Sequence, residues 1–118
     1  MRFFTKELSS TDVEFALSVP SHALGFFSVP EGAHRMQFDA VDINGYIWRF
    51  QLSTRLTGHP KPVLLRSSWH PFVEQKGLAR SDTVIFFRKQ DQENGIQYGV
   101  IAQKIIRLMG QDLGFIYR

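Results

Sequence analysis

The stretch that decides the fold runs from Met36 to Leu52 and reads MQFDAVDINGYIWRFQL. Apolar and polar residues alternate on both sides of Asn44-Gly45, a dipeptide that favours a tight hairpin turn because it tolerates positive φ angles. Successive side chains of a strand point to opposite faces, so the second half of this stretch has one apolar face. That face carries Tyr46, Trp48, Phe50 and Leu52. The pattern predicts a type I′ β-hairpin with one face in the core.

The other face of the second strand, continued past its end, is polar and carries Arg49, Gln51, Ser53 and Arg55. Arginine can pair with guanine and glutamine with adenine, and hydroxyl groups can contact bases or phosphates. Antiparallel sheets also commonly have one solvated polar face. Both interpretations, a binding face and a merely solvated one, remain open at this point.

Downstream of the hairpin, Gly58, Pro60 and Pro62 indicate a protruding loop over residues 54–62. A cap candidate at Ser68 and a glycine at Gly77 bound a short helix. β-branched and aromatic residues predict strands on either side of a polar turn. The remaining expected elements are a strand Val63 to Arg66, a strand Thr83 to Arg88, a turn Asp91 to Gly95 and a strand Gln97 to Ile101.

Upstream of the hairpin, a first strand is expected from Arg2 to Lys6. Thr11-Asp12-Val13-Glu14 has the pattern of a capping box, in which Thr11 would cap a helix and Glu14 would reach back to it. Pro20 removes a backbone donor and disfavours helical geometry at Val19, so this helix must be short.

The composition fits one compact domain over residues 1–118, because 43% of the residues are hydrophobic and 14% are aromatic. Short strands in hairpins with two short helices predict a small barrel or pseudobarrel. The absence of cysteine excludes disulfides and thiolate metal sites. No apolar run approaches the roughly 20 residues of a membrane span, so we expect a cytoplasmic or nuclear protein without a membrane partner.

Charge is distributed unevenly along the chain. Residues 1–48 carry three basic and six acidic side chains, a net −3, whereas residues 49–89 carry eight basic and two acidic ones, a net +6. A basic block interleaved with aromatic and hydroxyl residues is typical of a surface that binds a polyanion. A solvated basic face on an ordinary domain has the same composition.

Candidate catalytic groups do not form a known pattern. Asp39 and Asp42 could be metal ligands of a nuclease, but strand alternation places them on opposite faces. The four histidines lack the H-E-x-x-H spacing, and neither a G-x-S-x-G elbow nor a G-x-x-x-x-G-K-[ST] loop is present. We therefore expect no enzyme, no cofactor, no metal site and no small-molecule substrate.

Several short motifs, in this order, resemble the plant-specific B3 DNA-binding domain family, and in particular its small single-domain members. The likeness covers about residues 3–104 and leaves 105–118 as a C-terminal extension. The matching motifs are Phe4-Thr5-Lys6-Glu7-Leu8, Thr11-Asp12-Val13, Val19-Pro20, Asp42-Ile43-Asn44-Gly45, Trp48-Arg49-Phe50, Lys61-Pro62-Val63-Leu64, Trp69-His70-Pro71-Phe72-Val73, Lys76-Gly77-Leu78 and Ser81-Asp82-Thr83-Val84-Ile85-Phe86.

The resemblance implies a mainly β fold, a seven-stranded open pseudobarrel with two short α-helices. It implies two arms that enter the major groove of DNA, an N-terminal arm over Leu8 to Val19 and a C-terminal arm over Arg49 to Arg66. It also implies a nuclear plant transcription factor that binds double-stranded DNA sequence-selectively, with other transcriptional regulators as further partners. Trp48, Phe50, Trp69, Phe72 and Val73 would then be core.

The sequence departs from the family at two places. Family members place basic residues and an asparagine before the valine-proline step, where this chain has Glu14-Phe15-Ala16-Leu17-Ser18. Ser81 stands where the family has glycine, which is expected to strain or reshape one turn.

The candidate DNA contacts therefore fall into three groups. Hydroxyl groups of the first arm and polar side chains of the second would reach bases or phosphates, and cations would neutralise phosphates. The full set is Ser9, Ser10, Thr11, Arg49, Gln51, Ser53, Thr54, Thr57, Arg55, Lys61 and Arg66. A protein-interaction module on the same fold, suggested by Glu14 and Phe15, is the second hypothesis, and a small hydrolase or nuclease is the third.

Overall fold

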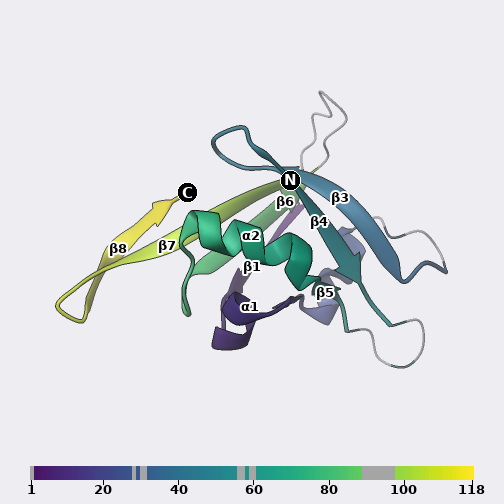
Figure 1. Ribbon diagram of the computed structural model, residues 1–118, viewed down its shortest axis with the longest axis horizontal. Coiled ribbons are helices and arrows are strands. Elements are labelled where there is room, and N and C mark those ends of the chain that lie inside the picture. The colour runs from purple at the N-terminus through teal and green to yellow at the C-terminus, as the bar shows by residue number, and fades with distance from the viewer. Residues whose placement is uncertain (1, 28, 30–31, 56–57, 59–60, 89–97) are drawn as a thin grey trace.

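The computed structural model describes residues 2–27, 29, 32–55, 58, 61–88 and 98–118 (Figure 1). Along the chain, the elements are β1 (Arg2–Glu7), α1 (Ser10–Glu14), β2 (Leu17–Ser18), the 3-10 helix η1 (Ser21–Phe26), β3 (Arg35–Val41), β4 (Ile47–Ser53), β5 (Val63–Leu64), α2 (Arg66–Lys76), β6 (Thr83–Arg88), β7 (Tyr98–Leu108) and β8 (Gln111–Tyr117).

Seven strands follow one another in a single curved sheet in the order β1-β6-β7-β3-β4-β5-β2, and β8 pairs with β7 beside this path. All neighbours are antiparallel except β3 and β7, which run parallel. Figure 1 shows α2 lying across the sheet and the β7–β8 hairpin projecting from one side. The expected seven-stranded pseudobarrel with two α-helices is confirmed, and the described residues add an eighth strand.

The β3–β4 hairpin has the two faces that its alternation predicts. Phe38 pairs with Phe50, and Ala40 with Trp48; all four are buried, whereas Arg49 on the other face is exposed. Tyr46 continues the apolar alternation of Trp48 and Phe50, but it precedes the first residue of β4 and is 56% exposed. Its ring lies 4.8 Å from that of Trp48.

The turn of this hairpin is not the expected type I′. Only Gly45 of the Asn44-Gly45 pair has a positive φ, 84°. The N–H of Gly45 donates to the Asp42 carbonyl over 3.1 Å, and the N–H of Asp42 donates to the Tyr46 carbonyl over 2.9 Å. The loop inside the Asp42–Tyr46 pair is therefore three residues long, Ile43 to Gly45, and ends with a left-handed glycine, the geometry of three-residue hairpin loops.

Aromatic rings fill the space between the sheet and α2. The Phe50 ring lies 5.6 Å from that of Phe86 and 5.8 Å from that of Phe72, in edge-to-face contacts that favour aromatic packing. Trp69 stacks on Phe72 with the centroids 5.7 Å apart. Trp69, Phe50, Phe72 and Phe86 are fully buried, and with Trp48 and Val73 also buried the expected core role of Trp48, Phe50, Trp69, Phe72 and Val73 is confirmed.

Both helices begin earlier than their sequence signals indicate. Helix α2 starts at Arg66, a residue expected in a strand, and its N-cap is Leu65. The expected cap, Ser68, lies inside the first turn, where its Oγ donates to the Leu65 carbonyl and accepts from the Gln51 N–H. The helix ends at Gly77 in the left-handed region, as expected. Helix α1 is capped by Ser9 rather than Thr11, and Asp12 takes the part expected of Glu14.

The remaining elements agree with expectation where they are described. Strands β1 and β6 pair over their whole lengths, from Arg2 with Arg88 to Glu7 with Thr83. The turn at 91–95 and residue 97 of the next strand lie outside the described residues. Strand β7 continues to Leu108 and folds back as β8, so residues 105–118 form a hairpin. Ser81 has a φ of 79°, the strained geometry expected where the family has glycine.

No helix in the part of the chain that the structure describes is long and apolar enough to cross a membrane.

Neighbouring residues of β4 should respond oppositely to truncation. Trp48→Ala removes a buried ring and is expected to lower the free energy of unfolding by about 3–5 kcal/mol. Arg49→Ala removes an exposed side chain and should leave it nearly unchanged. Urea denaturation of both variants measures the difference, and the reverse order would mean that the strand faces are inverted.

Candidate functional site

The two expected arms are joined through the two-residue strand β5. On one side, Val63 and Leu64 pair with Ser53 and Leu52 at the end of β4. On the other side, the same two residues pair with Ser18 and Leu17 of β2. We call residues 8–19 the N-terminal arm and residues 49–66 the C-terminal arm. Their ends are neighbouring strands of one sheet, and Figure 1 shows α1 and β5 at the same lower side of the molecule.

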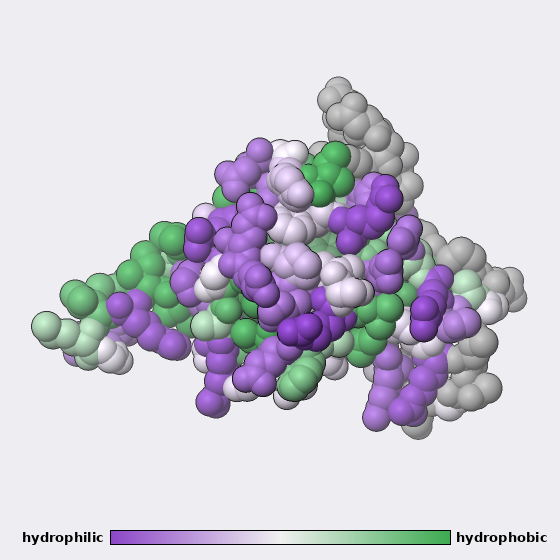
Figure 2. Space-filling model, viewed as in Figure 1, coloured by the Kyte–Doolittle hydropathy of each residue, from purple (hydrophilic) through white to green (hydrophobic). Residues whose placement is uncertain are grey.

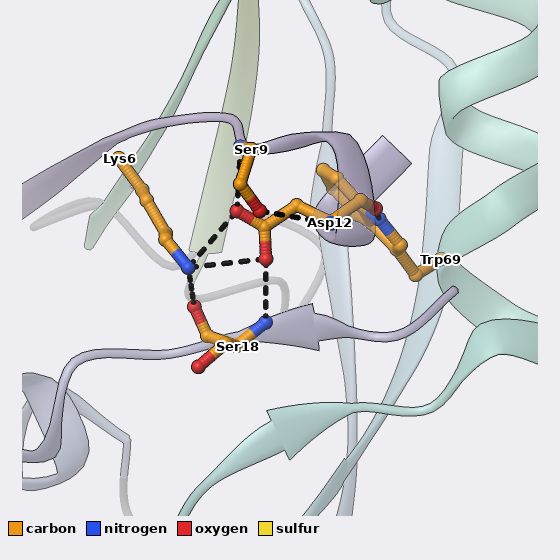
Figure 3. A network of polar contacts seen from close by, with 5 residues as sticks. All are labelled: Lys6, Ser9, Asp12, Ser18 and Trp69. Atoms are coloured by element: carbon orange, nitrogen blue, oxygen red, sulfur yellow. Dashed lines mark hydrogen bonds and ion pairs between the residues drawn. The ribbon is translucent and has the colours of Figure 1, made fainter. Parts of the chain in front are cut away.

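The N-terminal arm is held by the carboxylate of Asp12 (Figure 3). One oxygen accepts from the N–H of Ser9 over 2.9 Å, while the Ser9 hydroxyl accepts from the N–H of Asp12 over 3.1 Å. The other oxygen accepts from the N–H of Ser18 over 3.1 Å. A single buried side chain therefore fixes the start of α1 and the end of the returning strand β2.

Three residues from outside the arm complete this network. Lys6 Nζ lies 3.0–3.1 Å from the two carboxylate oxygens and donates to the Ser18 carbonyl over 2.6 Å. The indole N–H of Trp69 donates to the Asp12 carbonyl over 2.7 Å. Arg66 Nε donates to the Glu14 carbonyl over 2.9 Å. These contacts attach the arm to β1 and to α2.

Burial alone would raise the pKa of Asp12, but the hydrogen bonds from Ser9, Lys6 and Ser18 outweigh it and hold the pKa below the usual 3.8. The ionised carboxylate is therefore the form that the fold stabilises.

The hydroxyl groups expected to touch DNA differ in their availability. The Ser9 hydroxyl is occupied as the helix cap. Ser10 and Thr11 are exposed in the first turn of α1. Of the three hydroxyl groups expected from the sequence, Ser10 and Thr11 are exposed and do not cap the helix, whereas the equally exposed Ser9 already accepts a hydrogen bond within the arm.

The polar side chains on the outer face of β4 lie opposite polar side chains on the outer face of β3. Arg49 forms a two-pronged ion pair with Asp39, with Nε–Oδ1 at 2.9 Å and Nη2–Oδ2 at 3.4 Å, and this hydrogen bonding raises the pKa of Arg49. Gln51 lies opposite Gln37, and Ser53 lies opposite Arg35. Arg49 therefore has a partner within the protein, whereas Gln51 and Ser53 lie closer to the end of the strand.

A groove of about 350 Å³ lies at this end of the hairpin. Its lining is Arg35, Met36, Gln37, Gln51, Leu52 and Leu65. The two glutamine side chains can donate and accept hydrogen bonds there, and the guanidinium group of Arg35 can donate them. Arg35 and Gln37 were not among the sequence candidates, although the alternation of β3 places them on the same face as Gln51 and Ser53.

The remaining candidates surround the end of β4. Arg55, Lys61 and Arg66 are exposed. Arg55 follows β4, Lys61 lies two residues before β5, and Arg66 begins α2 just after β5. Thr54 donates its backbone N–H to the His34 carbonyl, and its Oγ1 is buried with no partner among the described residues. Thr57 lies outside the described residues.

The two aspartates considered as nuclease ligands are occupied separately. Asp39 pairs with Arg49, whereas Asp42 is buried and accepts from Trp48 Nε1 and Lys76 Nζ, each over 2.9 Å. Among the residues with described positions, no three histidine, aspartate or glutamate side chains gather to hold a metal ion.

Comparison with known proteins gives likenesses in sequence. No family model matches the chain. It is 33% identical over 88 residues to the B3 domain-containing transcription factor NGA4 of Arabidopsis thaliana, which covers 72% of this chain and 26% of the relative. It is 34% identical over 99 residues to auxin response factor 19 of Oryza sativa subsp. japonica, which covers 77% of this chain and 8% of the relative. The chain thus spans about a quarter or less of the length of these relatives.

Solved structures share the fold. The chain superposes on the Arabidopsis FUS3–DNA complex with a TM-score of 0.73 and 23% identity, covering 87% of this chain and 98% of that one. The Arabidopsis thaliana transcription factor LEC2–DNA complex gives a TM-score of 0.69 and 17% identity, covering 86% and 94%.

Replacing Asp12 by asparagine should loosen the N-terminal arm. The variant removes the charge opposite Lys6 and substitutes a donor for one acceptor, so we expect a loss of about 1–3 kcal/mol in unfolding free energy at pH 7. Because the folded-state pKa lies below 3.8, the stabilisation by Asp12 is complete above that pH and disappears as the pH falls through the folded-state value.

The gap in stability between the wild type and Asp12→Asn should therefore narrow in acid. Denaturant unfolding of both proteins at pH 7 and near pH 3 measures this gap. A gap that is the same at both pH values would show that the ionised carboxylate does not stabilise the fold.

Proposed function

The chain belongs to the B3 domain family, and on this premise we propose that its two arms bind double-stranded DNA as the sequence-selective domain of a nuclear plant transcription factor. The observation that carries this proposal is the pairing of β5 with both β4 and β2, which presents the two arms side by side. Two adjacent arms can both enter one groove of a DNA duplex.

Electrostatics supports a polyanion as the ligand of this end of the molecule. Arg55, Lys61 and Arg66 are exposed around β5, and Arg35 lies opposite Ser53 on the neighbouring strand. Exposed cations that replace condensed counterions on phosphates supply most of the sequence-independent affinity for DNA. These four residues are the proposed phosphate contacts.

Base recognition falls to the polar residues near the end of β4. Gln51 and Gln37 line the groove, and a glutamine can bond adenine through two atoms. Ser53 follows on the same face. Arg49 contributes less directly, because Asp39 already occupies its guanidinium group.

A protein-interaction module on the same fold is the second candidate. Glu14 and Phe15 favour it, because an exposed carboxylate and an exposed aromatic ring occupy the N-terminal arm. A duplex-binding titration separates the two functions.

Binding to duplex DNA should weaken steeply with salt. About four phosphate contacts give a slope of about −4 for the logarithm of the association constant against that of salt concentration. Lys61→Ala should reduce the slope by about one, whereas Arg107→Ala, in the β7–β8 hairpin, should not change it. Mobility-shift titrations between about 50 and 200 mM salt measure both. Affinity that does not respond to salt would favour the interaction module.

Removing the charge of Glu14 should strengthen DNA binding. Its side chain is exposed and is not the helix cap, so Glu14→Gln has no capping cost, and loss of repulsion from phosphate is expected to raise affinity about two- to fivefold. Glu14→Lys should raise it further, and both gains should shrink as salt increases. Unchanged affinity in both variants would mean that the N-terminal arm does not approach the duplex.

A further inference from the structure

The N-terminal arm carries one exposed large apolar side chain, Phe15. It is 56% exposed, whereas Leu8, Leu17 and Val19 of the same arm are buried. The exposed residues around it in the sequence are polar: Ser10, Thr11 and Glu14. The arm contains no lysine or arginine. Whatever it contacts must therefore be recognised by an aromatic ring and hydroxyl groups rather than by positive charge.

The backbone that carries Phe15 is fixed on both sides. The N–H of Phe15 donates to the Thr11 carbonyl over 2.8 Å, and the preceding carbonyl, that of Glu14, accepts from Arg66. Asp12 and Ser18 bracket the segment through the buried carboxylate. A ring on a fixed backbone loses little conformational freedom on binding, so even a small apolar contact can favour one ligand over another.

A protein partner is a poorer match for this feature. Apolar docking surfaces are contiguous patches of a few hundred Å². Most of the exposed large apolar side chains of the described residues lie on the β7–β8 hairpin, at the left of Figure 2, and a smaller group, Ile43, Tyr46 and Ile47, lies at the β3–β4 turn. Phe15 belongs to neither group; it follows Glu14, whose carbonyl accepts from Arg66.

In the major groove of DNA, the apolar group available to such a ring is the 5-methyl group of thymine. This methyl group distinguishes thymine from cytosine without any charge on the protein. We propose that Phe15 is a specificity-determining residue that packs against a thymine methyl group, so that the N-terminal arm selects thymine at the base pair it covers. The inference rests on the proposed function, and it assigns to the arm a contact that needs no basic residue.

Thymine-to-deoxyuridine substitution tests this contact, because it removes only the methyl group. The best duplex is first selected from random sequences, and each thymine is then replaced in turn. For the wild type, we expect replacement at one or two positions to weaken binding about three- to tenfold. Phe15→Ala should bind the thymine duplex more weakly by a similar factor and should no longer distinguish deoxyuridine at those positions.

Two controls keep the result specific. Phe115→Ala removes an equally exposed ring from β8 and should leave both affinity and deoxyuridine sensitivity unchanged. Phe15→Leu should retain part of the sensitivity, and a thermal melt of each variant shows that the fold is intact.

Two results would overturn the inference while leaving the proposed function in place. One is salt-dependent binding in which no thymine is sensitive to deoxyuridine. The other is sensitivity that persists undiminished in Phe15→Ala, which would assign the methyl contact to another residue. Failure of the wild type to bind any duplex would instead overturn the proposed function itself, and this inference with it.

Discussion

The position of the N-terminal arm depends on one carboxylate, that of Asp12. It accepts hydrogen bonds from the N–H groups of Ser9, the cap of α1, and of Ser18, the last residue of β2, and it pairs with Lys6 on β1. Without this carboxylate, the N–H groups of Ser9 and Ser18 would lose their hydrogen-bond partner within the protein. The same residue offers its backbone carbonyl to Trp69, so the arm and α2 are placed relative to each other.

This arrangement is repeated at two other turns. Three aspartates of the described residues are buried, and each lies within 3.3 Å of a lysine: Asp12 with Lys6, Asp42 with Lys76, and Asp82 with Lys104. Each also accepts two or more backbone N–H groups. Taking an ion pair out of water is costly, and these backbone donors offset part of that cost. The aromatic core provides the stability of the sheet, and the aspartates define the path of the chain where it leaves the sheet.

The sequence predicts the faces of the strands better than the contacts between them. Alternation correctly placed Trp48 and Phe50 inside and Arg49 outside. It could not show that Asp39 pairs with Arg49, because the cross-strand register depends on a turn whose length was misjudged. The cap of α1 was also predicted wrongly. Both Ser9 and Thr11 are acceptable caps, and the choice of Ser9 goes with contacts that Asp12 makes to residues outside the helix, Lys6 and Ser18. Arg35 and Gln37 could be assigned to the groove only after the register of β3 and β4 was known. Strand β8 was not predicted, because it lies beyond residues 3–104, the part of the chain that resembles the B3 family.

Amide hydrogen exchange of the free protein tests most directly whether the arm is fixed before it meets a ligand. The N–H groups of Ser9 and Ser18 donate to Asp12, and both residues have exposed side chains. If the carboxylate holds the arm, these two amides should exchange much more slowly than an unstructured chain, and Asp12→Asn should accelerate them more than the amides of β6. Exchange of Ser9 and Ser18 at the rate of an unstructured chain would contradict the account, because the arm would then be ordered only on binding.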